Sequence, residues 1–310
     1  MNVLRKATAA KFLVLGAFAA LAALATALCW SFGSICFTIS SRAVGSNVVN
    51  RLRIALALIL LMITHMILYG QIIPLDATPG QWFWFALSGF IGFTLGDSLL
   101  FRSFVLVGPR ISMLMMALAP VIGTVLAWAF LNEYLTVAKI AAITVTLIGI
   151  TLVVTERRQE DEPGRRRWTG ILIGIGAASG QALGLLLSKK GLAEGISPIS
   201  GNLIRLIAAT STMWFAAVIF GRVTSTIRSL RNRRAVWAIM GGAILGPFVG
   251  VGLSLVAIQH SYIGVASTIM ALPPIFLIPL SRFVFKEKIS ARGVIGTIIA
   301  LSGVALLFLL

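Results

Sequence analysis

Acidic residues are scarce in this chain. Only nine of its 310 residues are Asp or Glu, and residues of either charge make up 11% of the total. A soluble domain has roughly 25% charged residues and about 45–50% apolar ones. Here 58% of the residues are hydrophobic and the mean hydropathy is +1.00. A soluble fold could not bury this much apolar surface, whereas a bilayer can. The composition therefore indicates an integral membrane protein.

Groups that bind metals or carry out catalysis are equally scarce. Cys29 and Cys36 are seven residues apart and form neither a CxxC pair nor a metal site, and His65 and His260 stand alone. The sequence has no GxxxxGK[ST], GxSxG or HExxH motif. We therefore expect no metal, no cofactor and no enzymatic activity.

The net charge of +17 comes from basic residues spread over short connections between apolar runs. Such loops are typical of the cytoplasmic side of membrane proteins, so we expect no nucleic-acid partner. The first apolar run, 12–39, is too long for the hydrophobic core of a signal peptide, which has about 7–15 residues. We expect it to be an uncleaved first helix.

The chain contains ten apolar segments that are long enough to cross a bilayer, which takes about 20 residues. They are 12–39, 47–69, 80–104, 110–131, 136–155, 169–188, 198–220, 235–258, 263–284 and 290–310. Hydroxyl side chains at four of the breaks predict helix N-caps, namely Thr78, Thr136, Ser197 and Ser290. The sequence therefore predicts an all-α membrane protein with ten transmembrane helices.

Two stretches of the chain are nearly the same. MALAPVIGTVLAWAFLNE (Met116–Glu133) and MALPPIFLIPLSRFVFKE (Met270–Glu287) are 154 positions apart, and the same offset pairs Gly92 with Gly246, Gly96 with Gly250 and Gly149 with Gly303. This indicates a duplicated five-helix unit, 12–155 and 169–310, joined by a polar linker at 156–168. Since five is odd, the second copy must be inverted in the membrane, as is typical of secondary transporters.

In each copy, a proline is followed by about a dozen apolar residues, a glutamate, and a Leu/Ile-Thr/Ser pair that opens the next helix. With ALCWSFGS in the first helix and Arg53 in the second, this pattern resembles the EamA family of the drug/metabolite transporter superfamily. The resemblance marks Glu133 and Glu287 as structural residues of the family. It implies an exporter or exchanger of a small metabolite or drug-like solute, working by alternating access in the cell (inner) membrane.

Asp97 is the only acid well inside a predicted span. A charge there costs about 2.5–3.5 kcal/mol on insertion scales, so it is a functional candidate. Asp97 lies roughly 10 Å and Arg53 roughly 9 Å from the same membrane face, at 1.5 Å per helical residue. We therefore predict that they are close together. Asp97 is a candidate for carrying a coupling proton or facing a cationic substrate; the alternative is a purely structural ion pair.

Arg205 matches Arg53 in the second copy, but the position that matches Asp97 is Val251. Inversion predicts that Arg205 lies near the opposite membrane face. It is a candidate anchor for a substrate carboxylate or phosphate. The alternative is that its side chain extends to the lipid headgroups.

Prolines inside two helices predict the walls of a central cavity, because broken membrane helices are tolerated where they line protein or water. These prolines are Pro120, Pro273 and Pro274. Further lining candidates are Trp30, Asn50, Gln181 and Asn202. Glu133 and Glu287 lie at span ends, where we expect each carboxylate to accept hydrogen bonds from the N–H groups of the following helix. The face formed by Gly293, Gly296 and Gly303 suits close helix contact.

The expected partners are a small-molecule substrate and the lipid bilayer, with a proton as a candidate coupling ion. Two other functions stay open: a flippase for lipid-linked headgroups, and a membrane assembly subunit without transport. The sequence leaves open the substrate, the coupling ion and direction, and whether the chain is a monomer or a homodimer. It assigns 19 of the 26 basic residues to the face opposite the termini. By charge we expect the termini outside, whereas the resemblance implies the reverse.

Overall fold

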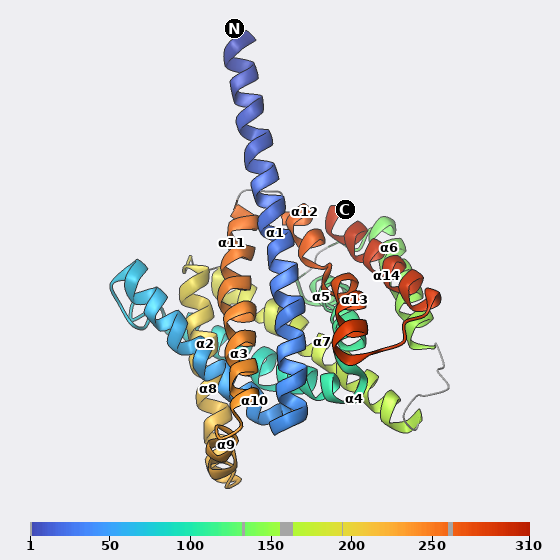
Figure 1. Ribbon diagram of the computed structural model, residues 1–310. Helices are drawn as coiled ribbons and strands as arrows, with labels where there is room; N and C mark the ends of the chain where they lie inside the picture. Colours follow the sequence, from blue (N-terminus) through green and yellow to red (C-terminus); the bar gives the residue numbers. More distant parts are fainter. Residues whose placement is uncertain (1, 132–133, 156–163, 194, 260–262) are drawn as a thin grey trace.

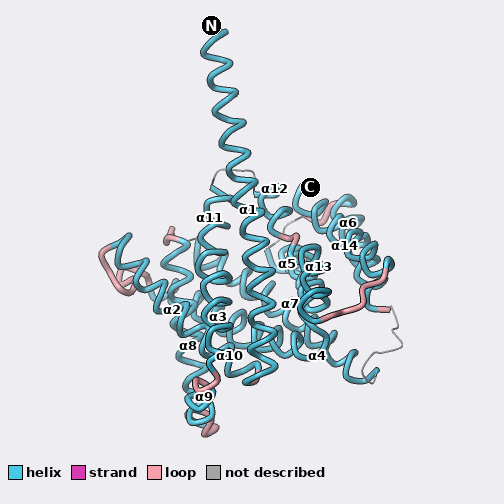
Figure 2. Tube along the Cα trace, in the orientation of Figure 1, coloured by secondary structure: helices cyan, strands magenta, loops and turns pink. Residues whose placement is uncertain are grey.

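The computed structural model describes residues 2–131, 134–155, 164–193, 195–259 and 263–310. These residues form helices joined by short turns and contain no strand (Figures 1 and 2). The elements are α1 (Asn2–Val44), α2 (Ser46–Tyr69), α3 (Pro79–Gly89), η1 (Phe90–Gly96), α4 (Asp97–Met116), α5 (Leu118–Leu131), α6 (Val137–Val154), α7 (Gly164–Leu192), α8 (Pro198–Ile219), α9 (Val223–Ser229), α10 (Arg233–Ala243), η2 (Ile244–Gly250), α11 (Val251–Gln259), α12 (Ile263–Met270), α13 (Pro273–Phe285) and α14 (Ala291–Leu309).

Within the described residues, eight helical stretches are long and apolar enough to cross a membrane. One of them, Pro79–Met116, contains all of the predicted span 80–104 and the start of the span 110–131. Its helical geometry is interrupted at Gly108, whose φ of 79° lies in the left-handed region that glycine adopts without strain. The predicted span 235–258 corresponds to α10, η2 and α11.

All four predicted N-caps are confirmed. In each, the hydroxyl oxygen accepts a hydrogen bond from the backbone N–H three residues later: Thr78 from Gln81 (3.2 Å), Thr136 from Lys139 (3.3 Å), Ser197 from Ser200 (3.4 Å) and Ser290 from Gly293 (3.0 Å). These bonds satisfy N–H groups that have no partner inside the helix, so they fix where the helices begin.

The predicted breaks at the prolines are also confirmed. α4 ends at Met116, four residues before Pro120, and α12 ends at Met270, four residues before Pro274. Proline has no N–H to donate to the carbonyl four residues earlier, so the helix stops at that carbonyl. The two breaks lie at the same place in the two copies of the duplicated unit.

Both copies also contain a π-helical segment at the same place. η1 begins at Phe90 and η2 at Ile244, which are 154 positions apart. The N–H of Asp97 donates to the carbonyl of Gly92, and the N–H of Val251 donates to that of Gly246. Wider turns of this kind are frequent at functional sites. The duplication therefore extends to an irregular feature of the backbone.

The two halves interlock. α3 and η1 of the first half pack against α7 and α8 of the second, while α10 and η2 pack against α1 (Figure 1). The approach is very close at Gly89, where an added Cβ would lie 2.2 Å from the carbonyl oxygen of Arg205. On the other side, an added Cβ at Gly33 would lie 3.6 Å from the backbone nitrogen of Gly246. Each half thus supplies walls to a shared centre.

α6 and α14 form a separate close pair, which confirms part of the predicted glycine face. A Cβ at Gly296 would lie 2.9 Å from the carbonyl oxygen of Gly149, and one at Gly303 would lie 2.4 Å from Thr146 Oγ1. Small residues of this kind let two helix backbones approach closely in a membrane.

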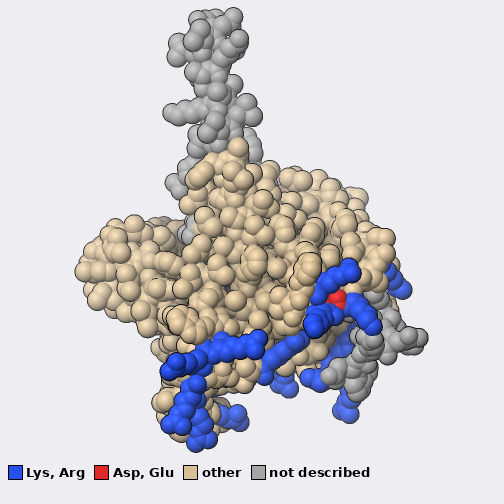
Figure 3. All heavy atoms as spheres, in the orientation of Figure 1, with Lys and Arg blue, Asp and Glu red and all other residues tan. Residues whose placement is uncertain are grey.

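Lysine and arginine gather at one end of the molecule, where α9 lies (Figures 1 and 3). Exposed arginines in or next to α9 include Arg222, Arg228 and Arg234. The C-terminal end of α14 lies toward the opposite end (Figure 1). The described residues therefore agree with the charge asymmetry predicted from the sequence.

Candidate functional site

A cavity of about 650 Å³ lies between the two halves. Its walls come from both proline-containing spans, 110–131 and 263–284, from the spans 12–39, 80–104, 169–188 and 235–258, and also from α2, α8 and α14. Nearly all predicted lining residues are on these walls: Trp30, Arg53, Asp97, Pro120, Gln181, Asn202, Arg205, Pro273 and Pro274. Most of the remaining wall is apolar, with several phenylalanines.

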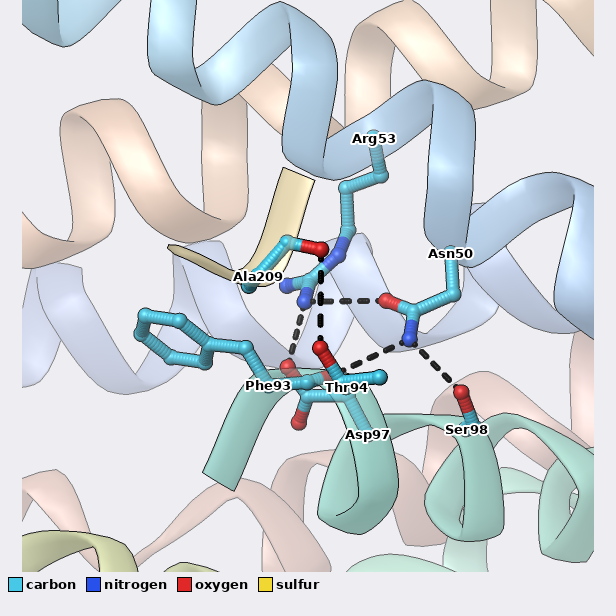
Figure 4. Close-up of polar contacts among 7 residues, drawn as sticks. All are labelled: Asn50, Arg53, Phe93, Thr94, Asp97, Ser98 and Ala209. Carbon is cyan, nitrogen blue, oxygen red and sulfur yellow. Dashed lines mark hydrogen bonds and ion pairs between the residues drawn. The ribbon is translucent and has the colours of Figure 1, made fainter. Parts of the chain in front are cut away.

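Arg53 and Asp97 form an ion pair, as predicted from their matched depths. Arg53 Nη2 donates to Asp97 Oδ2, and the two side chains are 11% and 13% exposed (Figure 4). The guanidinium of Arg53 also lies over the rings of Phe37 and Phe101, with its Cζ 5.4 and 5.0 Å from their centroids. The pair and the two rings form one wall of the cavity, where each charge offsets the burial cost of the other.

Asn50 is not on the cavity wall, so its predicted lining role is wrong. It is fully buried behind the ion pair (Figure 4). Its Nδ2 donates to the carbonyl of Phe93 and to Ser98 Oγ, both at 3.0 Å, and its Oδ1 accepts from Arg53 Nη2 at 3.3 Å. Asn50 therefore orients Arg53 and ties α2 to η1.

Arg205 lines the same cavity, so the alternative that its side chain extends to the lipid headgroups is wrong. Its place near the opposite membrane face stays a prediction. Its guanidinium carbon lies 4.3 Å from the centroid of the Phe93 ring. Nε and Nη2 are buried and have no hydrogen-bond partner in the described part of the chain. Asp97 is close enough for its negative charge to attract Arg205.

Arg205 fits against η1 and α3 because two residues there, Gly92 and Gly89, have no side chain. A Cβ at Gly92 would lie 3.3 Å from Arg205 Nη2, and one at Gly89 would meet the Arg205 backbone. The close approach of η1 and α8 brings the arginine of the second half beside the acid of the first. Within one chain this creates a site with two arginines and one aspartate.

Glu287 has a contact that the sequence did not predict. Its Oε2 lies 3.8 Å from Nε of Arg110, a residue of the first half, while Ser290 caps the helix that follows Glu287. Glu287 thus links the end of α13 to α4. Glu133 lies outside the described residues.

Sequence reasoning missed the aromatic residues of the site, Phe37, Phe93 and Phe101. The spacing of residues in the sequence could have identified two of these three, Phe37 and Phe101. Phe101 is four residues after Asp97 and Phe37 seven after Trp30, so each shares a helical face with a residue already selected. Among the described residues, no group of three His, Cys, Asp or Glu side chains could hold a metal ion.

Comparison with known proteins agrees with this architecture. The family model of the EamA-like transporter family matches residues 17–155 and 168–309. A solved structure titled "Crystal structure of protein" is 16% identical, covers 93% of this chain and 95% of its own, and has a TM-score of 0.60. At that identity, it shows the fold alone. A search of curated proteins gave no match.

The apolar helices and their shared central cavity define a multi-pass membrane protein of the transporter class. The chain belongs to the EamA-like transporter family, part of the drug/metabolite transporter superfamily.

Proposed function

We propose that this chain is a secondary transporter that exports or exchanges a small metabolite bearing an anionic group across the cell membrane. The observation that carries this proposal is Arg205, a buried guanidinium that lines the central cavity without a hydrogen-bond partner at Nε or Nη2 in the described residues. An uncompensated buried charge is costly, and an anionic ligand entering the cavity would relieve that cost.

The proposed mechanism is alternating access between two inverted halves of five helices, ten in all. The repeated π segments and proline breaks support two equivalent units, and their reciprocal packing suits a pseudo-two-fold axis. In transporters built this way, the substrate site lies near the bilayer midplane between the repeats, and one half rocks against the other. The broken helices α4–α5 and α12–α13 border the cavity and are positions where such movement can occur.

The experiment that tests this function is flux of a metabolite panel into proteoliposomes with an imposed pH gradient. Asp97 is the proposed proton carrier, since it lines the cavity beside two cations. We expect saturable flux that depends on the gradient, and we expect Asp97→Asn to abolish that dependence while the protein still inserts. Arg102→Gln, at an exposed arginine of α4, serves as the control. Absence of flux for every solute would refute transport, and unchanged flux in Asp97→Asn would leave only a structural ion pair.

Two other functions remain alternatives to small-metabolite transport. A flippase for lipid-linked headgroups would move labelled lipid between leaflets of the same proteoliposomes, and a non-transporting assembly subunit would move nothing. A passive subunit has no need for three buried charged groups in a cavity, because each is expensive to insert. This favours transport.

We place the arginine-rich end, where α9 lies, in the cytoplasm, since short cytoplasmic loops carry excess Lys and Arg. The termini would then be outside the inner membrane. A reporter that is active only in the cytoplasm, fused after Leu310, is expected to give no signal. Strong signal from that fusion would reverse the orientation. A second fusion within 222–234 provides the opposite expected result from the same chain.

A further inference from the structure

We infer that the substrate is an organic monoanion with a flat, largely aromatic body. This inference rests on the proposed transport function and adds the class of substrate. It depends on three features of the cavity: its charge, its wall chemistry and its size.

The charge of the cavity is the first feature. Its described wall carries three ionisable side chains, Arg53, Asp97 and Arg205. Asp97 is hydrogen-bonded to Arg53, so the surplus of one positive charge lies with Arg205. While Asp97 is ionised, a ligand with one negative charge makes the site neutral. A dianion such as a phosphomonoester would leave a buried negative charge, and a cation would add to a surplus that is already unfavourable.

A zwitterion fits the same charges less well. The carboxylate of an amino acid could face Arg205, but its ammonium would need Asp97, one oxygen of which already accepts from Arg53. The zwitterion would also leave the surplus positive charge in place. The charge balance therefore favours a simple acid over an amino acid.

The walls are the second feature. Seven aromatic side chains line the cavity: Trp30, Phe37, Phe85, Phe93, Phe101, Phe104 and Phe308. Aromatic rings pack well against another flat ring by offset stacking or edge-to-face contact. A sugar or nucleotide would leave many hydroxyl groups unpaired against such walls, at a cost of about 1–3 kcal/mol for each buried group. The wall also has three serines, of which Ser34 and Ser188 are hydrogen-bonded within the protein. Gln181, Asn202 and Ser267 suffice for a few polar substituents.

The size is the third feature. Pockets of about 300–1,000 Å³ hold drug-sized ligands, and this cavity of about 650 Å³ falls within that range. An acid with one or two rings fits in it. Its carboxylate would approach Arg205 from the cavity side, while the ring lies between phenylalanines.

Four probes with one phenylpropyl skeleton test this inference: 3-phenylpropionate, 3-phenylpropanamide, L-phenylalanine and 3-phenylpropylamine. They are matched in shape and differ in charge. We expect binding to the full-length purified protein, measured by calorimetry, to be tightest for 3-phenylpropionate. The neutral amide should bind about 10- to 100-fold more weakly, the range for losing a hydrogen bond to a charged group.

Variants of Arg205 link that preference to one side chain. In Arg205→Met, the dissociation constants for the acid and the amide should be within about two-fold of each other, well below the tenfold difference expected for the parent chain. Because it removes an unpaired buried charge, it is expected to fold at least as well as the parent chain. Arg205→Lys keeps the charge and should retain the preference for the acid. Arg102→Met makes the same change at an exposed arginine outside the cavity wall and should match the parent.

Tighter binding of the amine or of L-phenylalanine, no binding of any probe, or an acid preference that survives in Arg205→Met would overturn the substrate class. Flux in proteoliposomes separates this failure from failure of the proposed function. If another solute shows saturable flux, transport stands and only the substrate class is wrong. If no solute is transported and no probe binds, the proposed transport function and the substrate class are both wrong.

Discussion

Replacing Asp97 by leucine is expected to lower the free energy of unfolding by about 3–5 kcal/mol, because it leaves the buried guanidinium of Arg53 without its counter-charge. Both side chains of the pair are largely shielded, at 11% and 13% exposure. Arg53 would keep only the oxygen of Asn50 and the faces of two phenylalanine rings. Thermal unfolding of the purified protein in one detergent measures the loss.

The double variant Arg53→Met with Asp97→Leu distinguishes two causes of the instability: the unpaired charge of Arg53, and poorer side-chain packing at the wall. Once both charges are gone, apolar side chains of similar size can pack at this wall, and we expect most of the stability to return. Asp76→Leu is the matched control, because Asp76 is exposed between α2 and α3 and should change stability by less than about 0.5 kcal/mol. A double variant as unstable as Asp97→Leu alone would contradict this account.

Substitution of Gly149 by alanine is expected to cost about 1–3 kcal/mol, the range for overpacking a close-packed contact. An added Cβ would lie 2.2 Å from the backbone nitrogen of Ala300 and 2.6 Å from the carbonyl oxygen of Gly296. Backbone atoms cannot rotate away as a flexible side chain can, so α6 and α14 must separate. Thermal unfolding should show the lower stability.

Gly123 provides the control for that substitution. It lies in α5, and a Cβ there would meet nothing within 4 Å. Gly123→Ala should therefore be neutral or stabilising, by up to about 1 kcal/mol, since alanine is the better helix former. Equal losses in both variants would mean that helix contact at Gly149 is not the cause.

Features that depend on local chemistry could be predicted from the sequence. The four caps, the breaks before Pro120 and Pro274 and the membrane class each follow from the residues at those places. The duplication was visible as a constant offset. The Arg53–Asp97 contact was also predictable, because helical rise converts position in a span into depth, and equal depth on neighbouring helices allows contact.

Only the tertiary structure decided which parts of the two halves meet. Arg205 lies beside Phe93 and in the field of Asp97 because α8 packs against α3 and η1, where glycines let the backbones touch. The packing of α2 against η1 and α4 buries Asn50 beside the ion pair, and the approach of α13 to α4 sets Glu287 near Arg110. Hydropathy and residue spacing indicate which segments span the bilayer and at what depth each residue lies. They carry no information on the rotation and register between helices far apart in the chain, which side-chain packing between those helices sets.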